Sequence, residues 1–199
     1  MSSVIQVRWL TKNFGQQFTA VNDLSFSVHK GDVYGFLGQN GAGKSTTIRM
    51  LLSLIEPTAG EIEIFGLPLA ANRSAIMQKV GAVIEKPAMY EYLTAYQNLK
   101  IFSALSGVSK TKTQLLQELD VVGLATRAQD NVGTFSQGMK QRLAIAMAMV
   151  NDPELILLDE PTNGLDPQGI ADIRNLILQL SREQGKIVLV SSHLLSEIE

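Results

Sequence analysis

The segment Gly38-Gln39-Asn40-Gly41-Ala42-Gly43-Lys44-Ser45 constrains this chain more than any other feature. It matches the pattern G-x-x-x-x-G-K-[ST], in which the backbone N–H groups of a glycine-rich loop form a nest for phosphate. A short apolar run, Val33 to Leu37, precedes the loop, and apolar residues at helical spacing follow it from Ser45 to Leu54. Because the loop lies between a predicted strand and a predicted helix, the N-terminus of that helix adds its partial positive charge to the nest.

This phosphate-binding loop also predicts what its side chains do. We expect Lys44 to reach the β- and γ-phosphates of a nucleotide and the hydroxyl of Ser45 to coordinate Mg²⁺. The expected nucleotide contacts are Gly38, Gln39, Asn40, Gly41, Ala42, Gly43, Lys44, Ser45 and Thr46.

A second segment, Leu155 to Glu160, is a predicted apolar strand that ends in two adjacent carboxylates. Asp159 at the strand end suits Mg²⁺ coordination through water, and Glu160 is then placed to polarise an attacking water as a general base. Taken alone, a buried strand followed by a solvated acidic turn explains the pattern equally well. Downstream of a phosphate-binding loop, the pair favours a catalytic role.

Alternating strand and helix patterns predict an α/β domain with a mainly parallel sheet. The N-terminal third contains predicted strands at Val4 to Leu10 and Leu24 to Val28, and an edge strand at Glu61 to Ile64. From about residue 88 to residue 150 strand patterns disappear and helix formers dominate, which we interpret as an inserted helical lobe. The chain stops partway through a helical pattern, at Ser196 to Glu199, and we therefore expect a truncated C-terminus.

Composition excludes several classes of protein. There are 17 Lys and Arg against 19 Asp and Glu, a net charge of −2, which argues against a general binder of polyanions. Cysteine is absent, so disulfides, thiolate metal sites and cysteine nucleophiles are excluded within this sequence. The longest apolar run, Leu143 to Val150, is much shorter than the ~20 residues of a membrane-spanning helix.

Three further segments narrow the class. At Phe135 to Arg142 a Ser-x-Gly turn opens a long apolar helix, which is another helix-start anion site. Asn163-Gly164-Leu165-Asp166-Pro167 follows the two carboxylates, and Ser191-Ser192-His193 follows the last predicted strand. Taken singly, His193 is more typical of a surface or capping histidine than of a catalytic one.

In this order and spacing, the segments resemble the motifs of an ATP-binding cassette (ABC) domain, over essentially the whole chain. Gly38 to Ser45 is similar to the Walker A motif, and Leu155 to Glu160 to the Walker B motif with its catalytic glutamate. Ser136 to Met139 resembles the signature motif, Gly164 to Pro167 the D-loop and His193 the switch histidine. The resemblance implies a single nucleotide-binding domain over residues 1–199. Its fold would be a P-loop NTPase (RecA-like) core with an N-terminal antiparallel β subdomain and an inserted α-helical signature subdomain.

The resemblance further implies ATP and Mg²⁺ as cofactors, with Lys44, Glu160 and His193 as catalytic residues. Phe14 resembles the A-loop aromatic residue that stacks on adenine, and the alternative is an ordinary core phenylalanine. In the family, the signature motif of one domain completes the Walker A site of another. That arrangement adds Ser136, Gly138 and Asp166 to the expected nucleotide contacts.

Two positions depart from the family pattern. The signature reads Ser-Gln-Gly-Met instead of Ser-Gly-Gly-Gln, yet it keeps Ser136 and Gly138. Glu85 stands where most members have glutamine, and together with Met89 to Leu99 it resembles the bacitracin-resistance and lantibiotic-immunity exporters. A carboxylate at residue 85 can still accept Mg²⁺, although a surface glutamate is the alternative. The expected metal ligands are therefore Ser45, Glu85 and Asp159.

The resemblance implies an ATPase subunit that powers bacterial export of an antimicrobial peptide or drug. Its expected partners are a second ABC ATP-binding domain, in a homodimer that forms with ATP, and membrane-spanning permease subunits on separate chains, but no nucleic acid. The expected location is the cytoplasmic face of the cell membrane. The alternative is a soluble, non-transport ABC ATPase acting on ribosomes or nucleic acid. The single cassette and the absence of cysteine and of heptad arrays favour the exporter.

Overall fold

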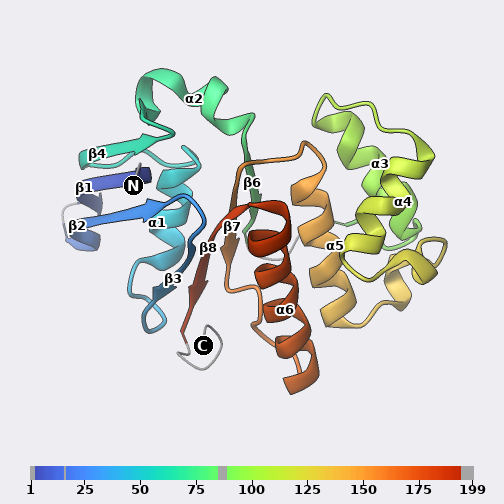
Figure 1. Ribbon diagram of the computed structural model, residues 1–199. Helices are drawn as coiled ribbons and strands as arrows, with labels where there is room; N and C mark the ends of the chain where they lie inside the picture. Colours follow the sequence, from blue (N-terminus) through green and yellow to red (C-terminus); the bar gives the residue numbers. More distant parts are fainter. Residues whose placement is uncertain (1–2, 16, 85–88, 194–199) are drawn as a thin grey trace.

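Two β-sheets organise residues 3–15, 17–84 and 89–193, the part of the chain that the computed structural model describes (Figure 1). One sheet is antiparallel with strand order β2-β1-β4-β5, and the other is parallel with order β3-β8-β7-β6. The antiparallel sheet contains β1 (Ser3–Phe14), β2 (Phe18–His29), β4 (Ala59–Ile64) and β5 (Leu67–Pro68). The parallel sheet contains β3 (Val33–Leu37), β6 (Val80–Val83), β7 (Leu155–Asp159) and β8 (Ile187–Ser192).

Helix α1 (Lys44–Leu51) joins the two sheets. Its buried Ile48 packs in one core with residues of β1, β2 and β4 and with Leu155 and Leu157 of β7. Successive side chains of a strand point to opposite faces, so the next residue of β7, Ile156, packs into a second core with the helical side of the molecule. The parallel sheet is therefore covered on both faces, which explains why β7 is an unbroken apolar run.

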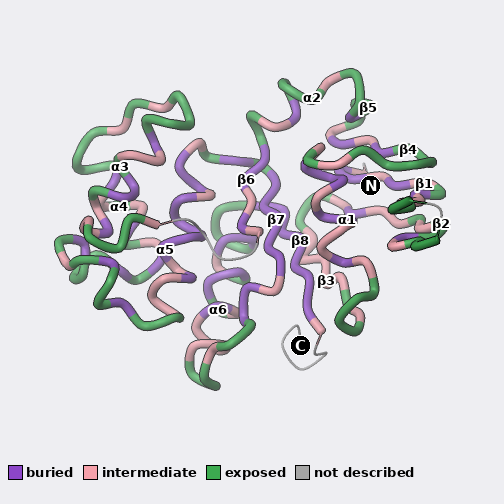
Figure 2. Tube along the Cα trace, turned by 180° about the vertical axis from the view of Figure 1, so that it is seen from behind, coloured by how far each residue is buried: buried purple, intermediate pink, exposed green. Residues whose placement is uncertain are grey.

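The helical lobe expected between residues 88 and 150 is present, and Figure 2 shows buried residues running from β7 and β8 into α5 and α6. Two of its helices begin at capping boxes. The Thr94 hydroxyl accepts the N–H of Gln97 at 3.1 Å, and the Gln97 side chain accepts the N–H of Thr94 at 2.9 Å. The helices on this side are α3 (Ala95–Leu105), α4 (Lys112–Val121), α5 (Gln137–Met149) and α6 (Pro167–Gln184), with 3₁₀ turns at Ala125–Arg127 and Val132–Thr134.

Two details differ from the sequence-based expectation. The strand predicted at an edge, β4, lies between β1 and β5, because the two-residue strand β5 pairs with Glu63 and Ile64. Helix α2 (Leu69–Met77) was not predicted, because only Leu69 and Ile76 of its residues are buried and a kink at Asn72 interrupts the helical pattern.

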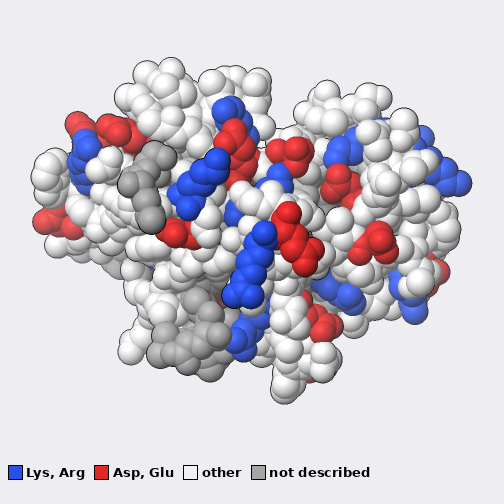
Figure 3. Space-filling view, in the orientation of Figure 1, with Lys and Arg blue, Asp and Glu red and all other residues white. Residues whose placement is uncertain are grey.

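The surface agrees with the small net charge. Acidic and basic side chains are interspersed over the face seen in Figure 3, and neither sign dominates it. Within the described ranges, no helix is both long enough and apolar enough to cross a membrane.

Candidate active site

The carboxyl ends of β3, β7 and β8 bring three of the predicted motifs to one edge of the parallel sheet. In the register, Leu37 of β3 pairs with Ser192 of β8, and Asp159 of β7 pairs with Ser191. The N–H of Gly38 donates to the carbonyl of Ser192 at 3.2 Å, which ties the phosphate-binding loop to the segment before His193. Ligands of open α/β sheets bind at this edge.

The loop before α1 has the backbone that a phosphate nest requires. Gly41 and Gly43 adopt positive φ angles of 84° and 89°. A Cβ at Gly43 would lie 2.4 Å from the carbonyl oxygen of Ala20 on β2, so a larger residue would force the backbone there to shift. Gly43 is also the N-cap of α1, and the first-turn N–H groups of a helix have no intrahelical acceptor. This cradle fits the phosphates of a nucleotide.

Lys44 lies across this loop. The residue is 5% exposed, and its Nζ donates to the carbonyls of Gly38 at 2.7 Å and Gln39 at 3.1 Å. The same Nζ is 3.1 Å from Oε1 of Glu160. The structure therefore places the predicted phosphate-binding lysine beside the predicted general base.

Asp159 and Glu160 share a partner on the neighbouring strand. Ser191 Oγ donates to Oδ1 of Asp159 at 2.6 Å and accepts the N–H of Glu160 at 2.9 Å. Glu160 has a φ of 46°, a left-handed conformation that is uncommon outside glycine. The sequence analysis named Ser191 only as part of the segment before His193 and gave it no role, because its contact with Asp159 depends on the strand register.

His193 lies at the same carboxylate. Its Nδ1 is 3.2 Å from Oε2 of Glu160, and the imidazole is 30% exposed. The histidine therefore contacts the predicted catalytic group, which distinguishes it from an ordinary surface histidine.

The donor set suits Mg²⁺. Ser45 is on the first turn of α1 and Asp159 ends β7, so a hydroxyl and a carboxylate oxygen are the candidate ligands here. Mg²⁺ commonly binds through one or two protein side chains together with substrate phosphates and water. The third predicted ligand, Glu85, lies outside the described residues.

Phe14 ends β1 and is 47% exposed, so the core alternative for this residue is wrong. Its ring stacks against Phe18, its cross-strand partner on β2, with centroids 6.4 Å apart. Lys12 Nζ lies 5.2 Å from the centroid of the Phe14 ring. Sequence reasoning missed Phe18, which the hairpin pairing places beside Phe14.

The remaining predicted residues form a second group. Ser136 and Asp166 are the N-caps of α5 and α6: the Ser136 hydroxyl accepts the N–H of Met139 at 3.3 Å, and Asp166 Oδ1 accepts that of Gly169 at 3.1 Å. Ser136, Gly138 and Asp166 line one hollow of about 400 Å³. The lining of this hollow includes no residue of the phosphate-binding loop. These three residues therefore lie in a group apart from the phosphate-binding loop.

Comparison with known proteins finds one matching family model and several similar curated proteins. The family model described as ABC transporter matches residues 21–163. The chain is 50% identical over 199 residues to the bacitracin transport ATP-binding protein BcrA of Bacillus licheniformis, covering 100% of this chain and 64% of BcrA. It is 40% identical over 196 residues to the lantibiotic transport ATP-binding protein SrtF of Streptococcus pyogenes, covering 98% of this chain and 82% of SrtF. This chain therefore spans less than two thirds of the length of BcrA.

Among solved structures, the chain is similar to the ATP-binding cassette MJ0796, described as dimeric, in a post-hydrolysis state and bound to ADP and Pi. The TM-score is 0.83 at 26% sequence identity, and the match covers 98% of this chain and 90% of that one.

Proposed function

This chain belongs to the ABC transporter family, and we propose that it binds and hydrolyses ATP to power bacterial export of an antimicrobial peptide or drug. The similarity to BcrA and SrtF, which are named for the transport of bacitracin and a lantibiotic, supports the export of such a cargo. The observation that carries hydrolysis is the position of the Glu160 carboxylate, 3.1 Å from Lys44 Nζ and 3.2 Å from His193 Nδ1.

In the proposed reaction, residues 38–46 bind the phosphate oxygens through backbone N–H groups, and Lys44 neutralises negative charge on them. Bound Mg²⁺ supplies further charge neutralisation at the phosphates, and Ser45, Asp159 and Glu85 are the residues that would hold it. Glu160 accepts a proton from the attacking water, and His193 orients the Glu160 carboxylate.

Two copies of the chain are needed in this proposal. The helix N-terminus at Ser136 and Gly138 can bind anionic groups, and it lines a hollow without Lys44 or its loop. One nucleotide would contact both groups of residues if it lay between the loop of one chain and the hollow of another. We therefore propose a homodimer that closes on ATP, and the dimeric structure of MJ0796 supports this arrangement.

Permease subunits on separate chains are the proposed membrane partners, which would place the chain at the cytoplasmic face of the membrane. Tyr90 and Tyr92 form an edge-to-face pair with centroids 6.0 Å apart. Tyr92 is 74% exposed, and tyrosine is enriched at protein interfaces because its ring is apolar while its hydroxyl can hydrogen-bond. We propose this tyrosine pair as part of the contact with the permease.

The central test is Glu160→Gln, assayed for phosphate release in the assembled transporter. The amide keeps the shape of the side chain but cannot accept the proton, so hydrolysis should fall about 10²- to 10⁴-fold while ATP still binds. The matched control is Glu154→Gln at the opposite end of β7, where Glu154 forms a surface pair with Lys79 at 3.0 Å. Near wild-type phosphate release by Glu160→Gln would refute the proposed reaction.

A second experiment tests the partners. The tagged protein, expressed in its host, should copurify with a membrane protein, and its expression should raise resistance to a bacitracin-like or lantibiotic peptide. Glu160→Gln should abolish the resistance without abolishing copurification. Resistance that persists in this variant would contradict an energy-coupled exporter.

A further inference from the structure

Ser191 occupies an unusual position between the two carboxylate residues. It is fully buried, at 0% exposure, and pairs with Asp159 in the register of β7 and β8. Its hydroxyl proton goes to Oδ1 of Asp159 at 2.6 Å, and its oxygen accepts the N–H of Glu160 at 2.9 Å. A serine hydroxyl has one proton, so donation to Asp159 leaves its lone pairs for Glu160.

We propose that Ser191 is a positioning residue for ATP hydrolysis, which sets the orientation of the Asp159 carboxylate and the backbone of Glu160. This inference rests on the proposed function, because it assigns Ser191 a role through the metal ligand and the general base. Ser191 itself is not a catalytic residue.

The backbone of Glu160 gives the first reason. A non-glycine residue at a φ of 46° is strained by about 1–3 kcal/mol and persists only when its surroundings hold it. The hydrogen bond from the Glu160 N–H to Ser191 is such a restraint, and it acts at the residue whose side chain must meet water. Without it, the peptide is free to relax toward an ordinary φ and to carry the carboxylate away from Lys44.

The carboxylate of Asp159 gives the second reason. Asp159 is 9% exposed, so rotation of its side chain is restricted, and Ser191 holds one of its two oxygens. In the proposed function, the other oxygen would coordinate the metal. Partners of this kind orient the residues that bind metals, and their removal typically costs about 10- to 100-fold in metal affinity or activity.

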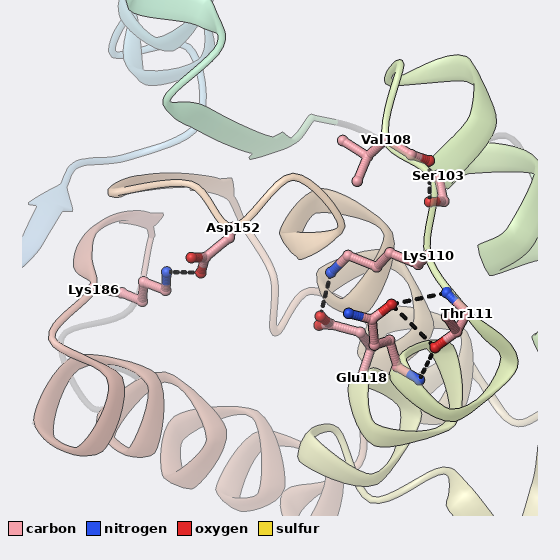
Figure 4. A network of polar contacts seen from close by, with 8 residues as sticks. Ser103, Val108, Lys110, Thr111, Glu118, Asp152 and Lys186 are labelled. Atoms are coloured by element: carbon pink, nitrogen blue, oxygen red, sulfur yellow. Dashed lines mark hydrogen bonds and ion pairs between the residues drawn. The ribbon is translucent and has the colours of Figure 1, made fainter.

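A matched control exists in the helical lobe. Ser103 is also buried, at 2% exposure, and its hydroxyl donates to the carbonyl of Val108 at 2.7 Å (Figure 4). Ser103→Ala therefore removes the same chemical group from a buried site outside the nucleotide-binding region. Any effect of Ser191→Ala beyond that of Ser103→Ala reports on position, not on the loss of a buried hydrogen bond.

The experiment compares Ser191→Ala, Ser191→Thr and Ser103→Ala in the assembled transporter and in the purified protein. Hydrogen exchange of the Glu160 amide, measured by NMR without nucleotide, should speed up at least about tenfold in Ser191→Ala, because the amide loses its acceptor. The affinity for Mn²⁺ in the presence of a non-hydrolysable ATP analogue, followed by electron paramagnetic resonance, should fall about tenfold. The kcat should fall by a similar factor with little change in the KM for ATP, and Ser191→Thr, which keeps the hydroxyl, should restore all three.

Ser191→Ala that matches Ser103→Ala in amide exchange, Mn²⁺ affinity and kcat would overturn the inference. If Ser191→Ala does not fold, Ser191→Cys keeps the volume with a much weaker donor and is judged by the same measurements. Failure of the proposed function is recognised separately. If the proposed function is wrong, Glu160→Gln would hydrolyse ATP at the wild-type rate, whereas Ser191→Ala would still speed up hydrogen exchange of the Glu160 amide.

Discussion

Replacing Glu160 by glutamine should destabilise the nucleotide-free protein and tighten its binding of ATP. In this structure Glu160 is the anionic partner of Lys44, whose side chain is only 4% exposed and lies in the loop that would receive the phosphates. Nucleotide phosphate has to compete with this carboxylate for the ammonium. Glutamine removes this competition. The free energy of unfolding that is lost without nucleotide should therefore be gained as free energy of ATP binding.

The distance gives the size of the effect. Two unit charges 3.1 Å apart attract by about 5 kcal/mol at an effective dielectric constant of about 20. Most of this is offset by desolvation, and the ammonium keeps its bonds to Gly38 and Gln39 while the glutamine oxygen can still accept one. We expect a net loss of about 1–2 kcal/mol, which lowers the Tm of a chain of this size by about 2–8 °C. The same free energy corresponds to about 5- to 30-fold tighter binding of ATP.

The assays are scanning calorimetry without nucleotide and titration calorimetry with a non-hydrolysable ATP analogue. Removal of repulsion between Glu160 and the phosphates would also tighten binding, but it would leave the Tm unchanged. Only loss of the ion pair with Lys44 gives both effects together. Glu154→Gln, which breaks a surface pair next to the other end of β7, should change neither quantity. Tighter binding with an unchanged Tm, or unchanged binding, would refute the reasoning.

Three other substitutions give separate predictions. Lys44→Met should weaken binding of a fluorescent ATP analogue by at least about tenfold, because it removes the cation from the loop. Phe14→Ala should weaken the same binding by about 5- to 150-fold, the range for loss of a base-stacking ring, whereas Trp9→Ala, which removes another exposed aromatic residue from β1, should not. Gly43→Ala should lower the Tm by several degrees more than Gly41→Ala, because both glycines have positive φ but a Cβ meets backbone atoms only at Gly43. Equal Tm values for these two glycine variants would show that the loop can move away from β2.

The sequence correctly predicted those strands and helices whose local hydrophobic pattern matches their burial in the fold. The strand Val33 to Leu37 was predicted with its observed bounds, because an apolar run before a glycine-rich loop has few alternatives. Leu155 to Asp159 was equally clear, since a strand covered on both faces has to be apolar throughout. The antiparallel sheet, the parallel sheet and the helical lobe were all confirmed.

The missed features depend on which strands become neighbours. Ser191 meets Asp159 only because β7 and β8 pair in one particular register, and Phe18 meets Phe14 only through the pairing of β1 and β2. A shift of one residue would turn each side chain to the opposite face, and no local pattern fixes that choice. Helix α2 was missed for a different reason: it buries too little apolar surface to produce a helical period.

Glu160 makes contacts at two places, its backbone N–H and its side-chain carboxylate. The Glu160 N–H donates to Ser191, Lys44 Nζ lies 3.1 Å from Oε1, and His193 Nδ1 lies 3.2 Å from Oε2. A general base needs an oxygen that faces water. Competition for Lys44 by phosphate would release Oε1, whereas the bond to Ser191 is made by the backbone and need not change. In the proposed reaction, the Glu160 side chain would therefore exchange Lys44 for water when phosphate binds the loop, while its backbone bond to Ser191 stays in place.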